Sequence, residues 1–417
     1  MPDAALCSAA PAGRSSRGCE LADILIRYGE AYRSAHRLTC SQAKAMAAIT
    51  QCRTAALGGQ RHWCAACGYQ RYVYHSCRNR HCPKCQATAT AAWVKAREDE
   101  LLPVPYFHNV FTLPHELNAL VLFSERNRRA LLKLLFDAAA QTLLEFGRGE
   151  LGGQIGFTLV LHTWDQQLRP HFHLHALIAS GALAPDGARW IAGGREFLFP
   201  VRGLSKMFRA KYLDGLAELL ACGKLDLPPQ AALSAELLRR SAGLRRLRKK
   251  PWVVYSERPF AGPKKLIDYL GRYTHRTAIA NHRILACDDQ QVRFTWRDRR
   301  DGDRRKVMSL PAEEFIRRFL THVLPQRFMR IRHYGLLANR GKQERLAHVR
   351  ALLGNRTAPD ANDPPQTAAQ WLHVLLGIDI HQCPRCGGPL ATESLSPCRG
   401  DWPETATTRR VPPWDTS

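Results

Sequence analysis

Three histidines alternate with two apolar residues in the stretch His-Phe-His-Leu-His at residues 171–175, which lies inside an apolar run. Because successive side chains of a strand point to opposite faces, this alternation predicts a strand with all three imidazoles on one face. Imidazoles gathered on a rigid strand are a suitable site for a metal ion. The stretch therefore predicts a sheet that carries a metal site.

The order of the elements around this strand is mixed rather than strictly alternating, which favours an α+β fold with an antiparallel sheet. Aromatic and β-branched residues predict strands at 106–113 and 155–164, and a short polar link predicts that 155–164 and 171–179 form a hairpin. Further strands are expected at 252–255, 283–287 and 291–296. Apolar periodicity predicts helices at 21–49, 88–102, 125–146, 204–219, 263–276, 312–324 and 343–353.

The chain contains 14 cysteines, and five of them fall within residues 64–85. The pairs Cys64–Cys67 and Cys82–Cys85 each have the spacing C-x-x-C, which predicts four ligands of one tetrahedral zinc ion in a ribbon. Cys52, Cys77 and His81 are candidates for further zinc ligands. The pair Cys383–Cys386 forms half of another ribbon, with Cys398 and His381 as candidates to complete it.

Charge and hydropathy set the expected partner and location. Lys and Arg number 61 against 36 Asp and Glu, so the net charge of +25 favours a nucleic-acid partner over an ordinary basic enzyme. The cysteine-rich segment that is predicted to bind zinc, called the zinc module below, displays Arg78 and Arg80. It is expected to bind DNA; the alternative is a purely structural role. The sequence shows neither a signal peptide nor an 18-residue apolar run, and its cysteine spacing indicates a reducing compartment, so a cytoplasmic location is expected.

Tyr269 and Tyr273 are four residues apart and would share one face of the helix at 263–276. Two helical tyrosines are usually packing residues, but here they follow the histidine strand and lie among basic residues expected to bind DNA: Lys264, Lys265, Arg272 and Arg276. A tyrosine oxygen can attack a phosphodiester and conserve its energy in a phosphotyrosine, while Mg²⁺ or Mn²⁺ offsets the developing charge. The expected ligands of this ion are His173 and His175, with His171, His162, Asp165 and Gln166 as further candidates.

Several segments resemble the rolling-circle insertion-sequence transposases of the IS91 group. They are CRTAALGG at 52–59, SCRNR at 76–80, HCPKCQ at 81–86, YFHNVFTLPHELN at 106–118, LHTW at 161–164 and YLGRYTHR at 269–276. The resemblance runs from about residue 21 to 336. It implies an HUH endonuclease domain, with His173-Leu174-His175 as the His-hydrophobic-His pair and Tyr269 and Tyr273 as the two nucleophiles. Ala-Ser-Gly-Ala at 179–182 departs from the glycine-rich run that the group tends to have there.

These features predict four regions: a disordered N-terminus (1–20), a helix with the zinc module (21–102), the HUH/tyrosine domain (103–336), and a helix, linker and cysteine tail (337–417). The predicted function is that of a transposase, a metal-dependent DNA strand transferase that nicks and rejoins the single-stranded ends of an insertion sequence. One alternative is a plasmid replication initiator or relaxase-like nickase, which shares the chemistry. The other is a non-catalytic zinc DNA-binding regulator, in which the histidines and tyrosines would be scattered.

Overall fold

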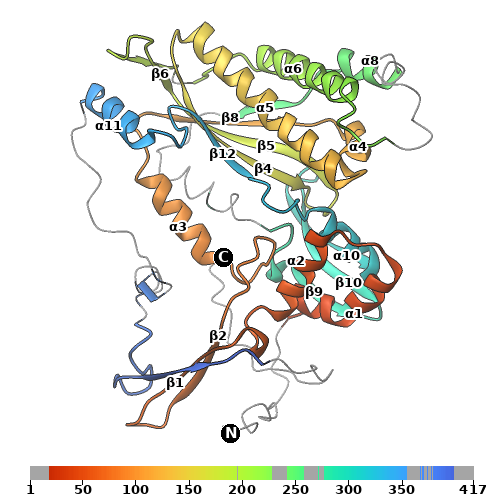
Figure 1. Cartoon of the computed structure of the whole chain (residues 1–417), viewed down its shortest axis with the longest axis vertical. Coiled ribbons are helices and arrows are strands. Elements are labelled where there is room, and N and C mark those ends of the chain that lie inside the picture. Colours follow the sequence, from red (N-terminus) through yellow and green to blue (C-terminus); the bar gives the residue numbers. More distant parts are fainter. Residues whose placement is uncertain are drawn as a thin grey trace. The chain divides into compact units, whose positions relative to one another are not determined.

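Helices and antiparallel sheets make up the described part of the chain, which confirms the expected α+β class (Figure 1). The computed structural model describes residues 18–194, 196–227, 242–257, 271, 277–354, 367, 369–370, 373, 377 and 379–398. The chain forms two compact units. The first combines three segments, Met1–Trp93, His275–Val323 and Asp363–Ser417, and the second combines Val94–Thr274 with Leu324–Asn362.

The second unit is built on a five-stranded antiparallel sheet in the order β12-β4-β5-β3-β8. Its strands are β3 (Tyr106–Thr112), β4 (Gly156–Trp164), β5 (Pro170–Ala179), β8 (Val254–Glu257) and β12 (Ile331–Gly335). The predicted hairpin of β4 and β5 is confirmed, and Asp165 closes its turn. The Asp165 carboxylate accepts hydrogen bonds of 2.8 Å from the backbone N–H groups of Gln167 and Arg169.

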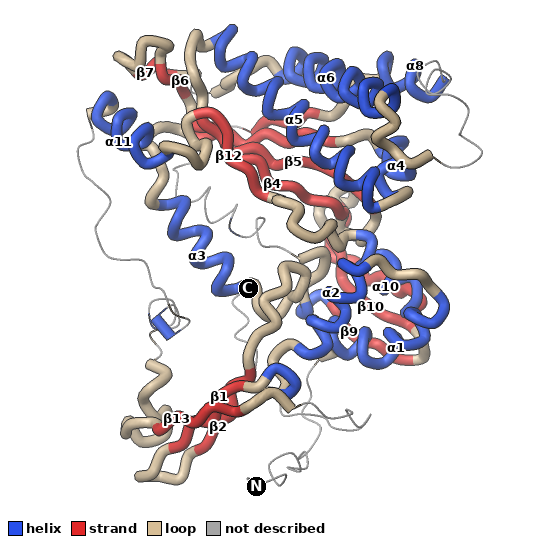
Figure 2. The backbone as a smooth tube through the Cα atoms, in the orientation of Figure 1, coloured by secondary structure: helices blue, strands red, loops and turns tan. Residues whose placement is uncertain are grey.

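Helices cover one face of this sheet, as Figure 2 shows for α5 (Glu125–Glu150) and α6 (Val201–Ala221). The side chains that point to this face from β3, β4 and β5 include Phe111, Phe157 and Leu174, all fully buried in the same core as the helical residues. Full burial of one such side chain contributes about 1.5–3 kcal/mol. Because side chains alternate along a strand, the residues between them, including His173 and His175, lie on the other face.

Shorter elements complete the second unit. They are α4 (Asn118–Leu122), a hairpin of β6 (Gly181–Leu183) and β7 (Trp190–Ala192), α8 (Ala242–Lys249) and α11 (Lys342–Leu352), while α3 (Ala87–Glu98) begins in the first unit. The run 179–182, which departs from the glycine-rich pattern, leads from β5 directly into β6. Gly181 has φ +130° there, and a Cβ would meet the Trp190 ring at 2.5 Å, so this position requires glycine.

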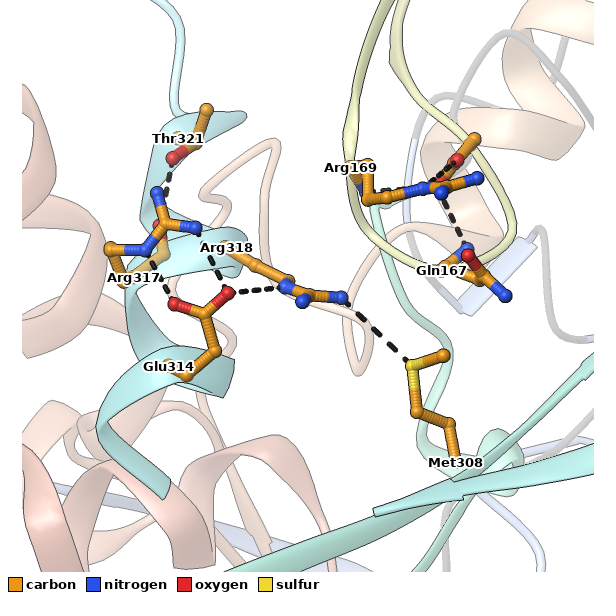
Figure 3. Close-up of polar contacts among 8 residues, drawn as sticks. Gln167, Arg169, Met308, Glu314, Arg317, Arg318 and Thr321 are labelled. Carbon is orange, nitrogen blue, oxygen red and sulfur yellow. Dashed lines mark hydrogen bonds and ion pairs between the residues drawn. The ribbon is translucent and has the colours of Figure 1, made fainter. Parts of the chain in front are cut away.

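The first unit contains one helical layer and a three-stranded sheet in the order β11-β10-β9. Its helices are α1 (Leu21–Ala35), α2 (Cys40–Gln51) and α10 (Ala312–Thr321), and its strands are β9 (Ile284–Asp288), β10 (Gln291–Asp298) and β11 (Arg304–Pro311). Within α10, Glu314 accepts hydrogen bonds of 2.6 Å from Arg317 and from Arg318 (Figure 3). These guanidinium groups, Arg317 first, lower the pKa of Glu314 to about 2.

A second three-stranded sheet of this unit has the order β13-β1-β2. It joins β1 (Gly59–Trp63) and β2 (Gln70–Tyr74) to β13 (Ala391–Leu395), which lies more than 300 residues later in the chain. Elsewhere in this unit, Cys19 and Cys287 form a disulfide. We did not expect a disulfide, because the cysteine spacing indicates a reducing compartment. Within the described ranges, no helix combines the length and the apolar character needed to cross a membrane.

Candidate metal centres

Three buried histidines converge on the face of the five-stranded sheet that is opposite to α5 and α6. His162 of β4 lies directly opposite His173 of β5 in the strand register, and His175 follows two residues later on the same face. Their exposed fractions are 4%, 9% and 7%, and one ring nitrogen of each lies within 4.8 Å of the other two. Opposite ligands of a Mg²⁺ ion lie about 4.2 Å apart. Neighbouring ligands of such an ion lie about 3 Å apart, so the three nitrogens lie close to, but slightly wider than, the spacing that one shared ion requires.

A hydrogen-bonded chain behind His175 selects which of its nitrogens can bind a metal. His108 Nδ1 lies 2.8 Å from Glu257 Oε2, and His108 Nε2 lies 2.8 Å from His175 Nδ1. The Glu257 carboxylate can only accept, so His108 donates from Nδ1–H; in the tautomer that carries its proton there, His108 Nε2 accepts a hydrogen bond from His175 Nδ1–H. The lone pair of His175 is then on Nε2, as in metal sites where a carboxylate orients a ligating histidine.

His108 and Glu257 were missed by the sequence analysis. Both were visible in the sequence, His108 within the predicted strand 106–113 and Glu257 just beyond the predicted strand 252–255. Their partnership depends on the register of β3 and β8, which pairs them directly. Strand register between distant segments is not encoded in the local pattern of either strand.

The structure places the other candidate ligands of this ion in different surroundings. His173 Nδ1 lies 2.9 Å from the carbonyl oxygen of His171, which leaves its Nε2 to bind a metal. The Trp164 ring stacks on His162 at a centroid distance of 5.1 Å. His171 itself is exposed near the start of β5 and lies outside the group of three. Gln166 and Asp165 lie in the turn between β4 and β5, and the Asp165 carboxylate is engaged in holding that turn.

Eight of the described cysteines form two groups of four, and this arrangement corrects the ribbon of Cys64, Cys67, Cys82 and Cys85 expected from the sequence. Cys82 and Cys85 converge with Cys52 and Cys77, whereas Cys64 and Cys67 converge with Cys383 and Cys386. The predicted grouping of Cys64 and Cys67 with Cys82 and Cys85 is therefore wrong. The predicted completion of the Cys383–Cys386 pair by Cys398 and His381 is also wrong, because neither residue belongs to the group that contains this pair.

The length of the β1–β2 hairpin explains why the predicted grouping fails. Cys64 and Cys67 lie in the turn that connects β1 and β2, whereas Cys52 precedes β1 and Cys77 follows β2 at the opposite end. Five-residue strands span about 16 Å. Cysteines at opposite ends of the hairpin are too far apart for one ion, so each end needs ligands from another segment.

The group of Cys52, Cys77, Cys82 and Cys85 has the features of a zinc site. Cys52 and Cys82 are fully buried, and the Cys77 and Cys85 sulfurs lie 3.7 Å apart. Sulfurs bound tetrahedrally at 2.3 Å are about 3.8 Å apart. Hydrogen bonds with the thiols of Cys77, Cys82 and Cys85 lower the pKa of Cys52, while the same contacts raise the pKa of Cys82, so without a metal the group favours a single thiolate that the neighbouring thiols stabilise. His81, a further candidate, is not part of this group.

Other predicted site residues are less closely defined. The two predicted nucleophiles and four of the basic residues expected to bind DNA lie outside the described residues: Tyr269, Tyr273, Lys264, Lys265, Arg272 and Arg276. Arg78 is exposed directly after Cys77, and Arg80 is half-buried, with burial lowering its pKa. Their role in DNA binding stays a prediction.

Known proteins resemble both parts of the chain. A family model described as "Transposase zinc-binding domain" matches residues 24–113, and one described as "Putative transposase" matches residues 156–345. A protein described as "Putative transposase y4qJ", from Sinorhizobium fredii, is 46% identical over 88% of this chain and 93% of its own length. The transposase for insertion sequence element IS801 from Pseudomonas savastanoi pv. phaseolicola is 27% identical over 81% of this chain and 79% of its own length.

Among solved structures, the conjugative relaxase TrwC in complex with oriT DNA shows a distant likeness. It is 19% identical to this chain, with a TM-score of 0.20 over 40% of this chain and 71% of the relaxase chain. Its metal-bound form gives the same identity and TM-score over 70% of that chain.

Proposed function

The chain belongs to the IS91 family of transposases, and from this premise we propose that it nicks and rejoins the single-stranded ends of an insertion sequence through a phosphotyrosine. The observation that carries the proposal is the convergence of His162, His173 and His175 on one sheet face. The regulator alternative expects scattered histidines, so this convergence counts against it. The replication-initiator or relaxase alternative would use the same site, and family membership favours the transposase.

In the proposed reaction, the hydroxyl of Tyr269 or Tyr273 attacks a phosphorus atom of the bound strand. The tyrosine oxygen forms a bond to phosphorus, the bond to the 3′ oxygen breaks, and that oxygen leaves as a hydroxyl while tyrosine loses its proton. Attack by a 3′ hydroxyl on the phosphotyrosine reverses the exchange and rejoins DNA without ATP. Mg²⁺ or Mn²⁺, when bound, would offset the charge on the phosphate and the leaving oxygen.

The residues of the sheet are proposed to hold and orient this ion. His162, His173 and His175 would each offer one ring nitrogen, Nε2 in the case of His173 and His175. His108 and Glu257 fix the tautomer of His175 and act as positioning residues. The zinc module and the net charge of +25 are proposed to supply affinity for DNA, because phosphate contacts from Lys and Arg dominate such binding.

A nicking assay tests this proposal. The purified chain would be incubated with single-stranded oligonucleotides that tile both ends of its element, with Mg²⁺ or Mn²⁺ and in parallel with a chelator of these ions. We expect cleavage at one position and a covalent protein–DNA adduct on a denaturing gel, both lost with the chelator. Cleavage of plasmid-origin oligonucleotides in place of the element ends would favour the initiator alternative. Absence of any cleavage would reject strand-transfer chemistry.

The His108–Glu257 pair gives a prediction of its own. Glu257→Gln and His108→Ala are expected to lower the cleavage rate about 10- to 100-fold, because loss of a partner that orients a metal ligand typically has this effect. The rate should recover partly at raised Mn²⁺ concentration, which a merely structural role would not produce. Tyr255→Phe is a matched control, since Tyr255 lies two residues away on β8 and its side chain is exposed. Mn²⁺ titrations of the cleavage rate provide the measurement, and unchanged titration curves for Glu257→Gln would contradict it.

A further inference from the structure

Two turns of identical backbone form carry the second cysteine group. One is Cys64-Ala-Ala-Cys67-Gly68 and the other is Cys383-Pro-Arg-Cys386-Gly387. In each turn, the glycine N–H donates to the carbonyl oxygen of the first cysteine, at 3.0 Å and 2.9 Å. The N–H of the first cysteine donates in turn to the carbonyl oxygen of Tyr69 or Gly388, at 2.9 Å and 2.8 Å. The two turns thus form matching halves of one site.

A glycine occupies the same left-handed position in both turns. Gly68 has φ +68° and Gly387 has φ +73°, a left-handed conformation that residues with a side chain rarely adopt. Each turn folds back so that both of its cysteines point to the same side. This backbone form therefore places the two sulfurs of each turn together before any metal binds.

The sulfur positions match a tetrahedral ion. The Cys64 and Cys386 sulfurs lie 3.5 Å apart, and those of Cys67 and Cys383 lie 3.6 Å apart. Four sulfurs bound at 2.3 Å would be separated by about 3.8 Å. These separations are too long for disulfides, whose S–S bond is about 2.05 Å. Cys64 and Cys383 are 2% and 3% exposed, so solvent does not separate the two halves.

The C-terminal half is also docked by strand pairing. All five residues of β13 pair with β1, from Gly59 opposite Leu395 to Trp63 opposite Ala391. Arg61 lies 3.6 Å from Glu393, and Arg71 donates a hydrogen bond of 2.7 Å to the carbonyl oxygen of Ile380. The exposed ion pair contributes little by itself. The strand pairing therefore brings the second cysteine turn to the turn between β1 and β2, where the four sulfurs meet.

We propose that Cys64, Cys67, Cys383 and Cys386 bind a second zinc ion, so that one zinc ribbon is divided between the two ends of the chain. The family model for the zinc-binding domain ends at residue 113 and does not include the C-terminal pair. Four thiolates in tetrahedral geometry select zinc or iron, and zinc is the ion of closed structural sites. Residues 379–398 are then an integral part of the zinc module. This inference does not rest on the proposed strand cleavage.

Metal content of the full-length chain tests the proposal directly. Elemental analysis of the wild type is expected to give two zinc ions per chain. The double variant Cys383→Ser/Cys386→Ser should hold one, and so should Cys52→Ser/Cys82→Ser, which removes ligands of the other group. Cys40→Ser/Cys222→Ser is the matched control, because both thiols are exposed and lie outside the two groups, and it should retain two. One zinc in the wild type, two in Cys383→Ser/Cys386→Ser, or iron in place of zinc would overturn the proposal.

A ligand exchange keeps the test informative if the serine variant fails to fold. Cys386 is exposed, so Cys386→His has room for an imidazole that can bind zinc in place of the thiolate. This variant should still hold two ions. After replacement of zinc by Co²⁺, its absorption spectrum should shift from that of four sulfurs towards that of three sulfurs and one nitrogen. A spectrum identical to that of the cobalt-loaded wild type would show that Cys386 is not a ligand and would overturn the proposal.

Discussion

The double variant Tyr269→Phe/Tyr273→Phe is expected to form no covalent adduct with single-stranded end DNA, a loss on the order of 10³-fold or more. Phenylalanine retains the aromatic ring at each position and removes only the hydroxyl that is proposed to act as the nucleophile. Binding should be unchanged, because affinity rests mainly on phosphate contacts from Lys and Arg. A denaturing gel measures the adduct and a gel-shift titration measures binding.

The single tyrosine variants test which tyrosine makes the first nick. If Tyr269→Phe or Tyr273→Phe alone abolishes the first nick, that tyrosine begins the reaction and the other acts in a later strand transfer. If both single variants still nick, the two hydroxyls are interchangeable. A double variant that still forms an adduct would refute tyrosine chemistry at these positions and require another nucleophile.

His173→Ala is expected to have the second-largest effect, lowering the cleavage rate about 10²- to 10³-fold while DNA binding is kept. Removal of one group that stabilises transition-state charge typically has this magnitude. His173 lies directly opposite His162 in the sheet and next to His175 on the same face, so its loss leaves at most two imidazoles for the ion. Single-turnover rates at a fixed Mn²⁺ concentration provide the measurement.

His171→Ala is the matched control for this variant. His171 belongs to the same strand and the same run of histidines, but it is exposed and lies outside the group of three. We expect its cleavage rate to stay near that of the wild type. Zinc content should be unchanged in both variants, since the cysteine groups contain neither histidine, and this separates loss of chemistry from loss of folding. Equal losses in His171→Ala and His173→Ala would argue against the assignment of the site.

Much of the sheet and the histidine face follow from local sequence patterns. The alternation at residues 171–175 has period two, and a strand has period two, so the shared face of His173 and His175 could be predicted without a tertiary structure. The hairpin of β4 and β5 was equally accessible, because its turn is short and Asp165 lies within it. The convergence of His162 also follows from this hairpin, although the sequence left several candidates open for the third ligand.

Local sequence patterns could not predict the contacts between distant segments. The spacing C-x-x-C predicts that two sulfurs point together, but not which second pair completes the site. The length of the β1–β2 hairpin and the pairing of β13 with β1 decide that Cys64 and Cys67 join Cys383 and Cys386 rather than Cys82 and Cys85.

The same distinction applies behind the histidines, where the register of β3 and β8 brings Glu257 to His108 and thereby orients His175. The sequence by itself determined which residues have metal-binding chemistry and which local turns and strands present them. The tertiary structure alone decided the partners, because side-chain periodicity is a property of one segment, whereas a metal site needs atoms from several segments within a few ångströms.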